Sequence, residues 1–204
     1  MDEYGQIQLN AIERKNLLKT AEQLFKSTHF TREETEKLLY KYRAITSDRI
    51  DRVKFRDLLH DTFGMSDDFF MDRVFRAFDK DTDGYLSQEE WVSGLSVFLR
   101  GTLDEKIKFC FFIYDLNSDG QISREEMFQM LKNTMVKQPT EEDPDEGIKD
   151  LVEMMFKRMD QGHQKVTLDE YKATVTKERL LIEAFGPCLP QRKCVEQFCE
   201  NLFS

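Results

Sequence analysis

The chain has 204 residues, a formal net charge of −9 and 40% hydrophobic residues, 17 of them phenylalanine. This apolar content can form one large or two small globular cores. The negative charge argues against nucleic acid as a partner, because phosphates are bound by clustered Lys and Arg side chains.

Neither membrane insertion nor lipidation is expected. The longest strongly apolar run, 109–114, is far shorter than the roughly 20 residues that span a bilayer. The chain opens without a charged-then-apolar signal segment, and Asp2 stands where N-myristoylation requires glycine. We therefore expect no membrane anchor and a cytoplasmic protein.

The first predicted part is an N-terminal lobe, residues 1–100. A helix is expected from about Asn10 and another from Thr31, which has capping-box spacing to Glu34. The next stretch, 46–57, resembles an EF-hand loop that has lost its metal. With Val53 as its eighth residue and Asp57 as its twelfth, too few oxygens converge to bind calcium.

Residues 79–90 have the full pattern of a calcium-binding EF-hand loop. Such a loop takes oxygen ligands from positions one, three, five, seven, nine and twelve, and has glycine at six. Those ligand positions hold, in order, Asp79, Asp81, Asp83, the backbone carbonyl of Tyr85, Ser87 through a water molecule, and Glu90. Gly84 stands at position six, and Leu86 at position eight is expected to pair with Val53 in a short antiparallel bridge.

The second predicted lobe, residues 101–176, contains a second complete loop at 115–126. Its ligand positions hold Asp115, Asn117, Asp119, the backbone carbonyl of Gln121, Ser123 and Glu126. A single Asp-rich turn is usually an ordinary solvated loop. Two complete copies, each flanked by helical apolar stripes, indicate two calcium sites.

The fourth loop, 159–170, is degenerate. With Val166 eighth and Glu170 twelfth, its first and third positions hold Met159 and Gln161; starting instead at Asp160 leaves the loop one residue short. Either alignment gives too few carboxylates for calcium. Val166 can still bridge to Ile122, and Thr167 with Glu170 has capping-box spacing. The acidic segment 138–147 before this hand is expected to be an exposed connection.

A helical extension is predicted at 177–204, with a helix around 177–185 and a last amphipathic helix carrying Val195, Phe198, Leu202 and Phe203. That last helix either completes the core or covers a groove until a target displaces it. The extension also holds three of the four cysteines, Cys188, Cys194 and Cys199, with Cys110 the fourth. They lack zinc-type spacing, so we expect free thiols; a redox switch among the last three is the alternative.

The predicted fold is therefore all-α, with four EF-hands in two paired lobes plus C-terminal helices. Two calcium ions are expected, with Mg²⁺ possible in the resting state. Because Glu90 and Glu126 lie on the exit helices, ion binding should rotate those helices and uncover an apolar groove for a partner helix. Methionines are candidate lining of that groove in the second lobe: Met127, Met130, Met135, Met154, Met155 and Met159.

Four hands with a degenerate first one, followed by extra C-terminal helices, resemble the neuronal calcium sensor group. Four segments are similar to a narrower family, the calaxin calcium sensors of ciliary outer-arm dynein: 72–76, 94–101, 137–151 and 183–190. This resemblance implies a monomer that binds the dynein heavy chain in the axoneme of a cilium or flagellum, with microtubules or tubulin as a further partner. It also implies calcium-dependent restraint of sliding. Members commonly have a fourth hand that can bind calcium, and 159–170 departs from that pattern.

Two other function classes stay open from the residues themselves. A calcium buffer would bind ions with little opening, and a phosphatase-regulating subunit would use the same hands on another target. An enzyme is not expected, since His29, His60 and His163 are scattered and form no recognisable catalytic constellation with Ser or Cys.

Overall fold

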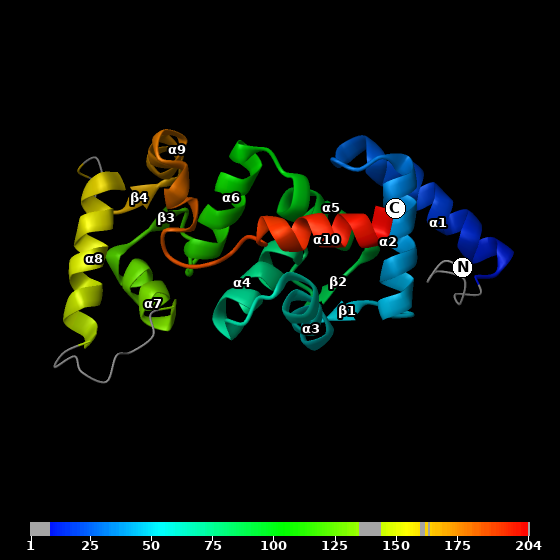
Figure 1. The fold of residues 1–204 in the computed structure, drawn as a ribbon, viewed down its shortest axis with the longest axis horizontal. Helices are drawn as coiled ribbons and strands as arrows, with labels where there is room; N and C mark the ends of the chain where they lie inside the picture. Colours follow the sequence, from blue (N-terminus) through cyan, green and yellow to red (C-terminus); the bar gives the residue numbers. More distant parts are fainter. Residues whose placement is uncertain (1–8, 135–143, 160–161, 163, 204) are drawn as a thin grey trace. The chain divides into compact units, whose positions relative to one another are not determined.

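The structure is a computed structural model that describes residues 9–134, 144–159, 162 and 164–203. The chain forms two compact units, residues 1–102 with 190–204, and residues 103–189. Each unit is helical and contains one two-stranded antiparallel sheet (Figure 1), so the predicted all-α EF-hand fold is confirmed. The extension predicted at 177–204 is divided between the two units.

Most of the first unit is built from paired helix–loop–helix segments around one sheet. Its elements are α1 (Ala11–Leu24), η2 (Phe25–Ser27), α2 (Arg32–Ile45), β1 (Ile50–Asp51), α3 (Arg52–Phe63), α4 (Asp68–Phe78), β2 (Tyr85–Leu86), α5 (Gln88–Arg100) and α10 (Arg192–Phe203). Capping boxes start α2 at Thr31 and α5 at Ser87, as their spacing to Glu34 and Glu90 predicts.

The core of this unit is an aromatic cluster where α3, α4 and α5 meet. The ring of Phe55 lies 4.9 Å from that of Phe78 and 6.5 Å from that of Trp91, and all three side chains are buried. Gly94 lies against Phe78, since a Cβ built on this glycine would be 2.2 Å from the ring. The hands therefore share one packed core, which fixes the exit helix α5 beside the entering helix α4.

The predicted register of the first hand is wrong. Ile50, and not Val53, pairs with Leu86, while Val53 lies on α3 with 68% of its surface exposed. The degenerate loop is therefore 43–54 and not 46–57. Asp51 caps α3 by accepting the N–H of Lys54. In the corrected register Lys54 stands at the twelfth position, where a calcium loop has glutamate.

Helix α10 packs on α2 and α3 of the first unit. The Phe198 ring lies 5.4 Å from the Phe63 ring, and the Lys41 ammonium lies 5.7 Å from the Phe198 ring centre. Phe198 and Leu202 are both buried, whereas Val195 and Phe203 are only partly so. In this structure the last helix completes the core of the first unit.

The second unit repeats the two-hand arrangement. Its elements are α6 (Leu103–Tyr114), β3 (Gln121–Ile122), α7 (Arg124–Thr134), α8 (Pro144–Met159), β4 (Val166–Thr167), α9 (Leu168–Lys177) and η3 (Arg179–Glu183). Ile122 pairs with Val166, and Thr167 forms a capping box with Glu170, as predicted. The methionines are mostly core: Met127, Met130, Met155 and Met159 are buried, Met154 is exposed, and Met135 lies outside the described residues.

Two local predictions are corrected. The connection expected at 138–147 ends sooner, because α8 begins at Pro144, a residue suited to the first turn of a helix; residues 138–143 lie outside the described part. The segment around 177–185, expected to be a helix, contains only the 3₁₀ turn η3. The Tyr171 hydroxyl donates to the Ile182 carbonyl, and this bond keeps the segment out of an α-helical conformation. Helix α4 is capped by Asp67, whose side chain accepts the N–H groups of Phe69 and Phe70.

Candidate metal centres

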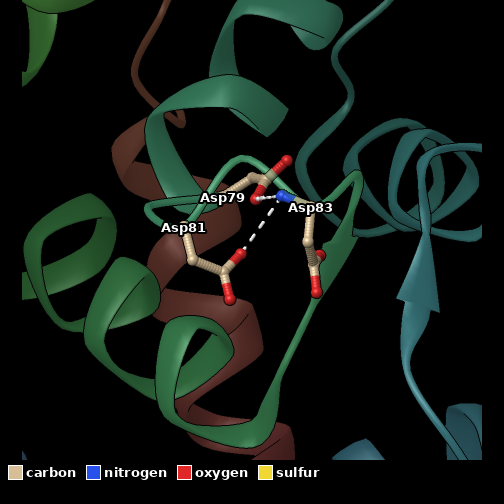
Figure 2. Close-up of side chains that lie close together, drawn as sticks. All are labelled: Asp79, Asp81 and Asp83. Carbon is tan, nitrogen blue, oxygen red and sulfur yellow. Dashed lines mark hydrogen bonds between the residues drawn. The ribbon is translucent and has the colours of Figure 1, made fainter.

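The first complete loop brings three carboxylates together between α4 and β2. Carboxylate oxygens of Asp79, Asp81 and Asp83 all lie within 4.8 Å of one another. Figure 2 shows the three side chains around one turn, with the backbone N–H of Asp83 donating to Asp79 Oδ1 and to Asp81 Oδ1 at 3.2 Å each. The backbone thus holds the first, third and fifth ligands on one side of the loop.

Asp79 is the best-fixed of the three, since it caps the end of α4 and is buried. Its Oδ2 accepts the N–H of Gly84 at 3.0 Å, and Gly84 has a φ of 85°, which glycine adopts without strain. Burial raises the pKa of Asp79; the Gly84 hydrogen bond lowers it, and the nearby Glu90 charge raises it again. A cation beside these carboxylates would relieve that repulsion.

Tyr85 contributes only its backbone to this loop. Its side chain is largely exposed, while its N–H donates to Asp83 Oδ1 at 2.9 Å. A calcium loop uses a backbone carbonyl at the seventh position, so the exposed ring is consistent with the predicted role.

Glu90 connects the start of the loop to the exit helix. Its Oε1 accepts the N–H of Lys80 at 2.8 Å and that of Asp81 at 3.3 Å, and its Oε2 accepts the N–H and the hydroxyl of Ser87. Burial raises the pKa of this carboxyl, but the hydrogen bonds from Ser87, Asp81 and Lys80 outweigh burial and lower it. The carboxylate is therefore ionised and lies over the loop, although it belongs to the first turn of α5.

The second complete loop repeats this geometry. Asp115 accepts the N–H groups of Asp119 at 3.1 Å and Gly120 at 2.8 Å, and Asn117 Oδ1 also accepts that of Asp119 at 2.8 Å. The N–H of Gln121 donates to Asp119 Oδ1 at 3.0 Å.

Glu126, the twelfth residue of this loop, is bound like its counterpart in the first. Its Oε1 accepts the N–H groups of Leu116 at 2.9 Å and Asn117 at 3.2 Å, and its Oε2 accepts from Ser123. Two loops of different sequence thus adopt one hydrogen-bond scheme.

The donor atoms of both loops suit calcium. They are carboxylate, amide and peptide oxygens, the ligands of a hard cation that takes six to eight oxygens in flexible geometry. The residues that would hold the ions are those predicted: Asp79, Asp81, Asp83, Tyr85 and Glu90 in one loop, and Asp115, Asn117, Asp119, Gln121 and Glu126 in the other. A bound ion would supply the positive charge that these acidic groups share.

Both degenerate loops carry cations: Lys54 replaces the twelfth-position ligand of the first loop, and Lys165 adds a positive charge to the fourth. In the first, the Lys54 ammonium at position twelve lies 3.4 Å from the hydroxyl of Thr46, the residue that the predicted register placed first in this metal-free loop. In the fourth, Met159 at position one is buried, and Lys165 at position seven bonds to Asp119 in the neighbouring loop. Gln161 and Asp160, weighed as ligands of that loop, lie outside the described residues.

The sequence pattern missed the corresponding cation of the first unit, Arg49, which bonds to Asp83. The pattern could have found it. Arg49 directly precedes Ile50, and Lys165 directly precedes Val166. Ile50 and Val166 are the first residues of the strands that the degenerate loops contribute to the sheets.

Two of the cysteines meet in the core of the second unit. The sulfurs of Cys110 and Cys188 lie 3.1 Å apart, and both thiols are buried. Cys194 and Cys199 lie half-buried on α10. All four are free thiols, and Cys188 contacts Cys110 rather than a neighbour in sequence.

Comparison with known proteins agrees with this architecture. An EF-hand domain pair matches residues 104–176, and an EF-hand domain matches residues 70–98. The chain is 55% identical to calaxin of Xenopus laevis over 94% of this chain and 97% of that protein, and 54% identical to calaxin of Danio rerio over 93% and 95%. It is also 32% identical to a calcineurin subunit of Candida glabrata over 77% of this chain and 88% of that protein.

The paired hands and the two oxygen-rich loops define an EF-hand calcium-binding protein of the sensor class. Within that class, the chain belongs to the calaxin family. No helix in the described part of the chain has both the length and the hydropathy needed to cross a membrane.

Proposed function

We propose that this protein is a two-site calcium sensor that regulates outer-arm dynein in the axoneme of cilia or flagella. Asp79–Glu90 and Asp115–Glu126 each take one ion, and Mg²⁺ can occupy them at rest. The sensor has no enzymatic activity of its own and acts on protein partners, the dynein heavy chain and microtubules or tubulin. It binds no nucleic acid and works as a monomer.

The observation that supports a sensor over a simple buffer is the position of the two glutamates. Glu90 and Glu126 are third residues of their exit helices, yet their carboxylates accept N–H groups from the second and third residues of their loops. When an ion binds these carboxylates, they must lose some of their existing hydrogen bonds to the backbone. The exit helices α5 and α7 would then move relative to the entering helices.

A groove of about 430 Å³ in the second unit is a candidate for the partner helix. It is lined by Arg124, Glu125 and Phe128 of α7 and by Lys149, Val152 and Glu153 of α8. Because Glu126 belongs to the first turn of α7, an ion that draws this carboxylate would move the helix and change the width of the groove. Apolar residues flanked by charges are typical of a surface that binds an amphipathic helix.

The dynein assignment is supported by membership in the calaxin family, together with the resemblance described above. A second candidate is the regulatory subunit of a phosphatase. It is favoured by one observation, the 32% identity to the calcineurin subunit over most of both chains.

The test compares the wild type with the double variant Glu90→Gln, Glu126→Gln. Calorimetry should give two calcium ions for the wild type, and an apolar-surface probe should brighten only for the wild type. Capture from a ciliary extract, with and without calcium, should retain dynein heavy chain in a manner that depends on calcium and on these glutamates. Uptake of calcium with a silent probe would identify a buffer, and retention of a phosphatase without dynein would favour the second candidate.

A further inference from the structure

In each unit a cation from the degenerate loop bonds to the same ligand position of the calcium loop. The Arg49 guanidinium donates to Asp83 Oδ2, and the Lys165 ammonium donates to Asp119 Oδ2 at 2.5 Å. Asp83 and Asp119 are the fifth-position ligands of their loops. The side chains of all four residues are partly exposed, so solvent and ions can reach these pairs.

The oxygen that each cation binds is the one left for a metal. Oδ1 of Asp83 already accepts the N–H of Tyr85, and Oδ1 of Asp119 accepts that of Gln121. This leaves Oδ2 of each aspartate for a metal, although Oδ2 of Asp119 also accepts the side-chain N–H of Asn117 at 3.2 Å. The guanidinium and the ammonium hold that atom.

The two sheets place Arg49 and Lys165 next to the calcium loops. Arg49 and Lys165 are the seventh residues of their loops, directly before Ile50 and Val166. A calcium loop uses only the backbone carbonyl at position seven, so its side chain can face the partner loop. The antiparallel register sets each cationic residue opposite the ninth position of the calcium loop, Ser87 or Ser123, and its long side chain extends from there to the fifth-position aspartate.

We propose that Arg49 and Lys165 set the calcium affinity of the neighbouring loops by competing with the ion for Asp83 and Asp119. Calcium must take Oδ2 from the tethered cation, and the released side chain repels the ion that replaces it. This inference rests on the proposed binding of one ion by each complete loop. It assigns the degenerate loops a role in tuning affinity besides their structural role in the sheets.

The test measures the calcium Kd of Arg49→Gln and Lys165→Gln by calorimetry. Each variant is made in a background with one remaining site, Glu126→Gln for Arg49 and Glu90→Gln for Lys165. We expect about two- to fivefold tighter binding, the range that an exposed charge pair supports. The variants Arg49→Lys and Lys165→Arg keep the charge and should keep affinity close to that of their background.

Two controls separate local competition from total charge. Arg32→Gln in the first unit removes a cation that pairs with Glu36, and Lys132→Gln in the second unit removes one that pairs with Asp145. Both pairs lie away from the calcium loops. These control variants should tighten binding much less. Thermal unfolding of the calcium-free proteins provides a second readout, since loss of an exposed pair should leave the melting temperature nearly unchanged while the stabilisation produced by calcium increases.

Each outcome bears on one proposal. If the parent background takes up no calcium, the proposed two-site function fails. If the parent binds calcium but Arg49→Gln and Lys165→Gln bind it equally or more weakly, the cations are not competitors and this inference is overturned. Equal tightening in the control variants would also overturn it.

Discussion

The Glu90 carboxylate accepts the backbone N–H of Lys80 at 2.8 Å, so the last residue of the loop is bonded to its second. Replacing this carboxylate by an amide in Glu90→Gln removes one charge and one strong oxygen ligand. We expect calcium binding to this loop to weaken by about 100-fold or more, because ligand charge sets Kd over several orders of magnitude. Calorimetry should then count one ion instead of two.

The matched control is Glu89→Gln, which removes the same charge from the neighbouring exposed residue of α5. It should leave the ion count at two. Glu126→Gln and its neighbour Glu125→Gln form the corresponding pair in the second unit. Two ions bound by Glu90→Gln would contradict the ligand assignment.

The complete loops were predictable because their chemistry is local. Ligand spacing, the glycine at six and the capping box all lie within twelve residues, and the structure places each of them as the spacing requires. The degenerate first loop offered no such local rule. An alignment on the acidic residue Asp57 moved the register by three residues and placed Val53 in the sheet.

Packing, and not ligand chemistry, fixes that register. Phe55 and Leu59 of α3 are buried as Trp91 and Leu95 of α5 are, and each pair has the same separation in sequence. Aligning the apolar faces of the exit helices would have placed Ile50 opposite Leu86. The bond from Arg49 to Asp83 depends on this register, so an alignment based on Asp57 could not find it.

Gly94 of α5 should be intolerant of any side chain. Its missing Cβ would be 2.2 Å from the Phe78 ring, so Gly94→Ala forces the ring or the helix to move. We expect a loss of about 1–3 kcal/mol in the free energy of unfolding, the usual result of overpacking a core. Trp91, the single tryptophan of the chain, lies in the same core, and its fluorescence during urea unfolding measures this loss.

Gly147→Ala supplies the comparison, because nothing lies within 4 Å of a Cβ built on that glycine of α8. Alanine favours a helix over glycine by up to about 1 kcal/mol, so this variant should be stabilised. Thermal unfolding followed by circular dichroism would show it. Equal effects of the two substitutions would contradict the close packing of Gly94.

Glu34 should make the first unit sensitive to acid. It forms two hydrogen bonds with the Arg100 guanidinium, at 2.6 and 2.8 Å. Burial raises the pKa of Glu34, but Arg100 and the capping bonds of Thr31 outweigh burial and lower it below 4.5. A carboxyl whose pKa is lowered by folding stabilises the protein above its ordinary pKa, and this stabilisation is lost as the pH falls through the folded value.

Glu34→Gln tests this effect, because glutamine can still complete the capping box while the charge is lost. We expect the variant to be about 1–2 kcal/mol less stable at pH 7 by Trp91 fluorescence. The difference from wild type should close as the pH falls below 4.5. Glu33→Gln, in the same turn but exposed, should show little difference at any pH; a constant gap for Glu34→Gln down to pH 3 would argue against the ion pair.

Cys110 should react with alkylating reagents more slowly than Cys194 or Cys199 in the folded protein. Burial raises its pKa well above the ordinary value of 9.0, and the adjacent Cys188 thiol raises it further. Since the thiolate is the reactive form, alkylation at pH 8 should be at least about 100-fold slower at Cys110 than at Cys194 or Cys199. Peptide mass spectrometry after a timed iodoacetamide pulse measures the order, and the difference should vanish in urea.

Phe198 should anchor the last helix to the first unit. It is 4% exposed and packs against Phe63, so Phe198→Ala leaves a cavity and should cost about 3–5 kcal/mol, detected by Trp91 fluorescence. Lys193→Ala, an exposed change on the same helix, should cost under about 0.5 kcal/mol. If α10 only completes the core, Phe198→Ala should capture less target, in proportion to its loss of stability. Tighter capture by this destabilised variant would instead mean that the helix covers a target groove, since weakening the cover would favour the partner that displaces it.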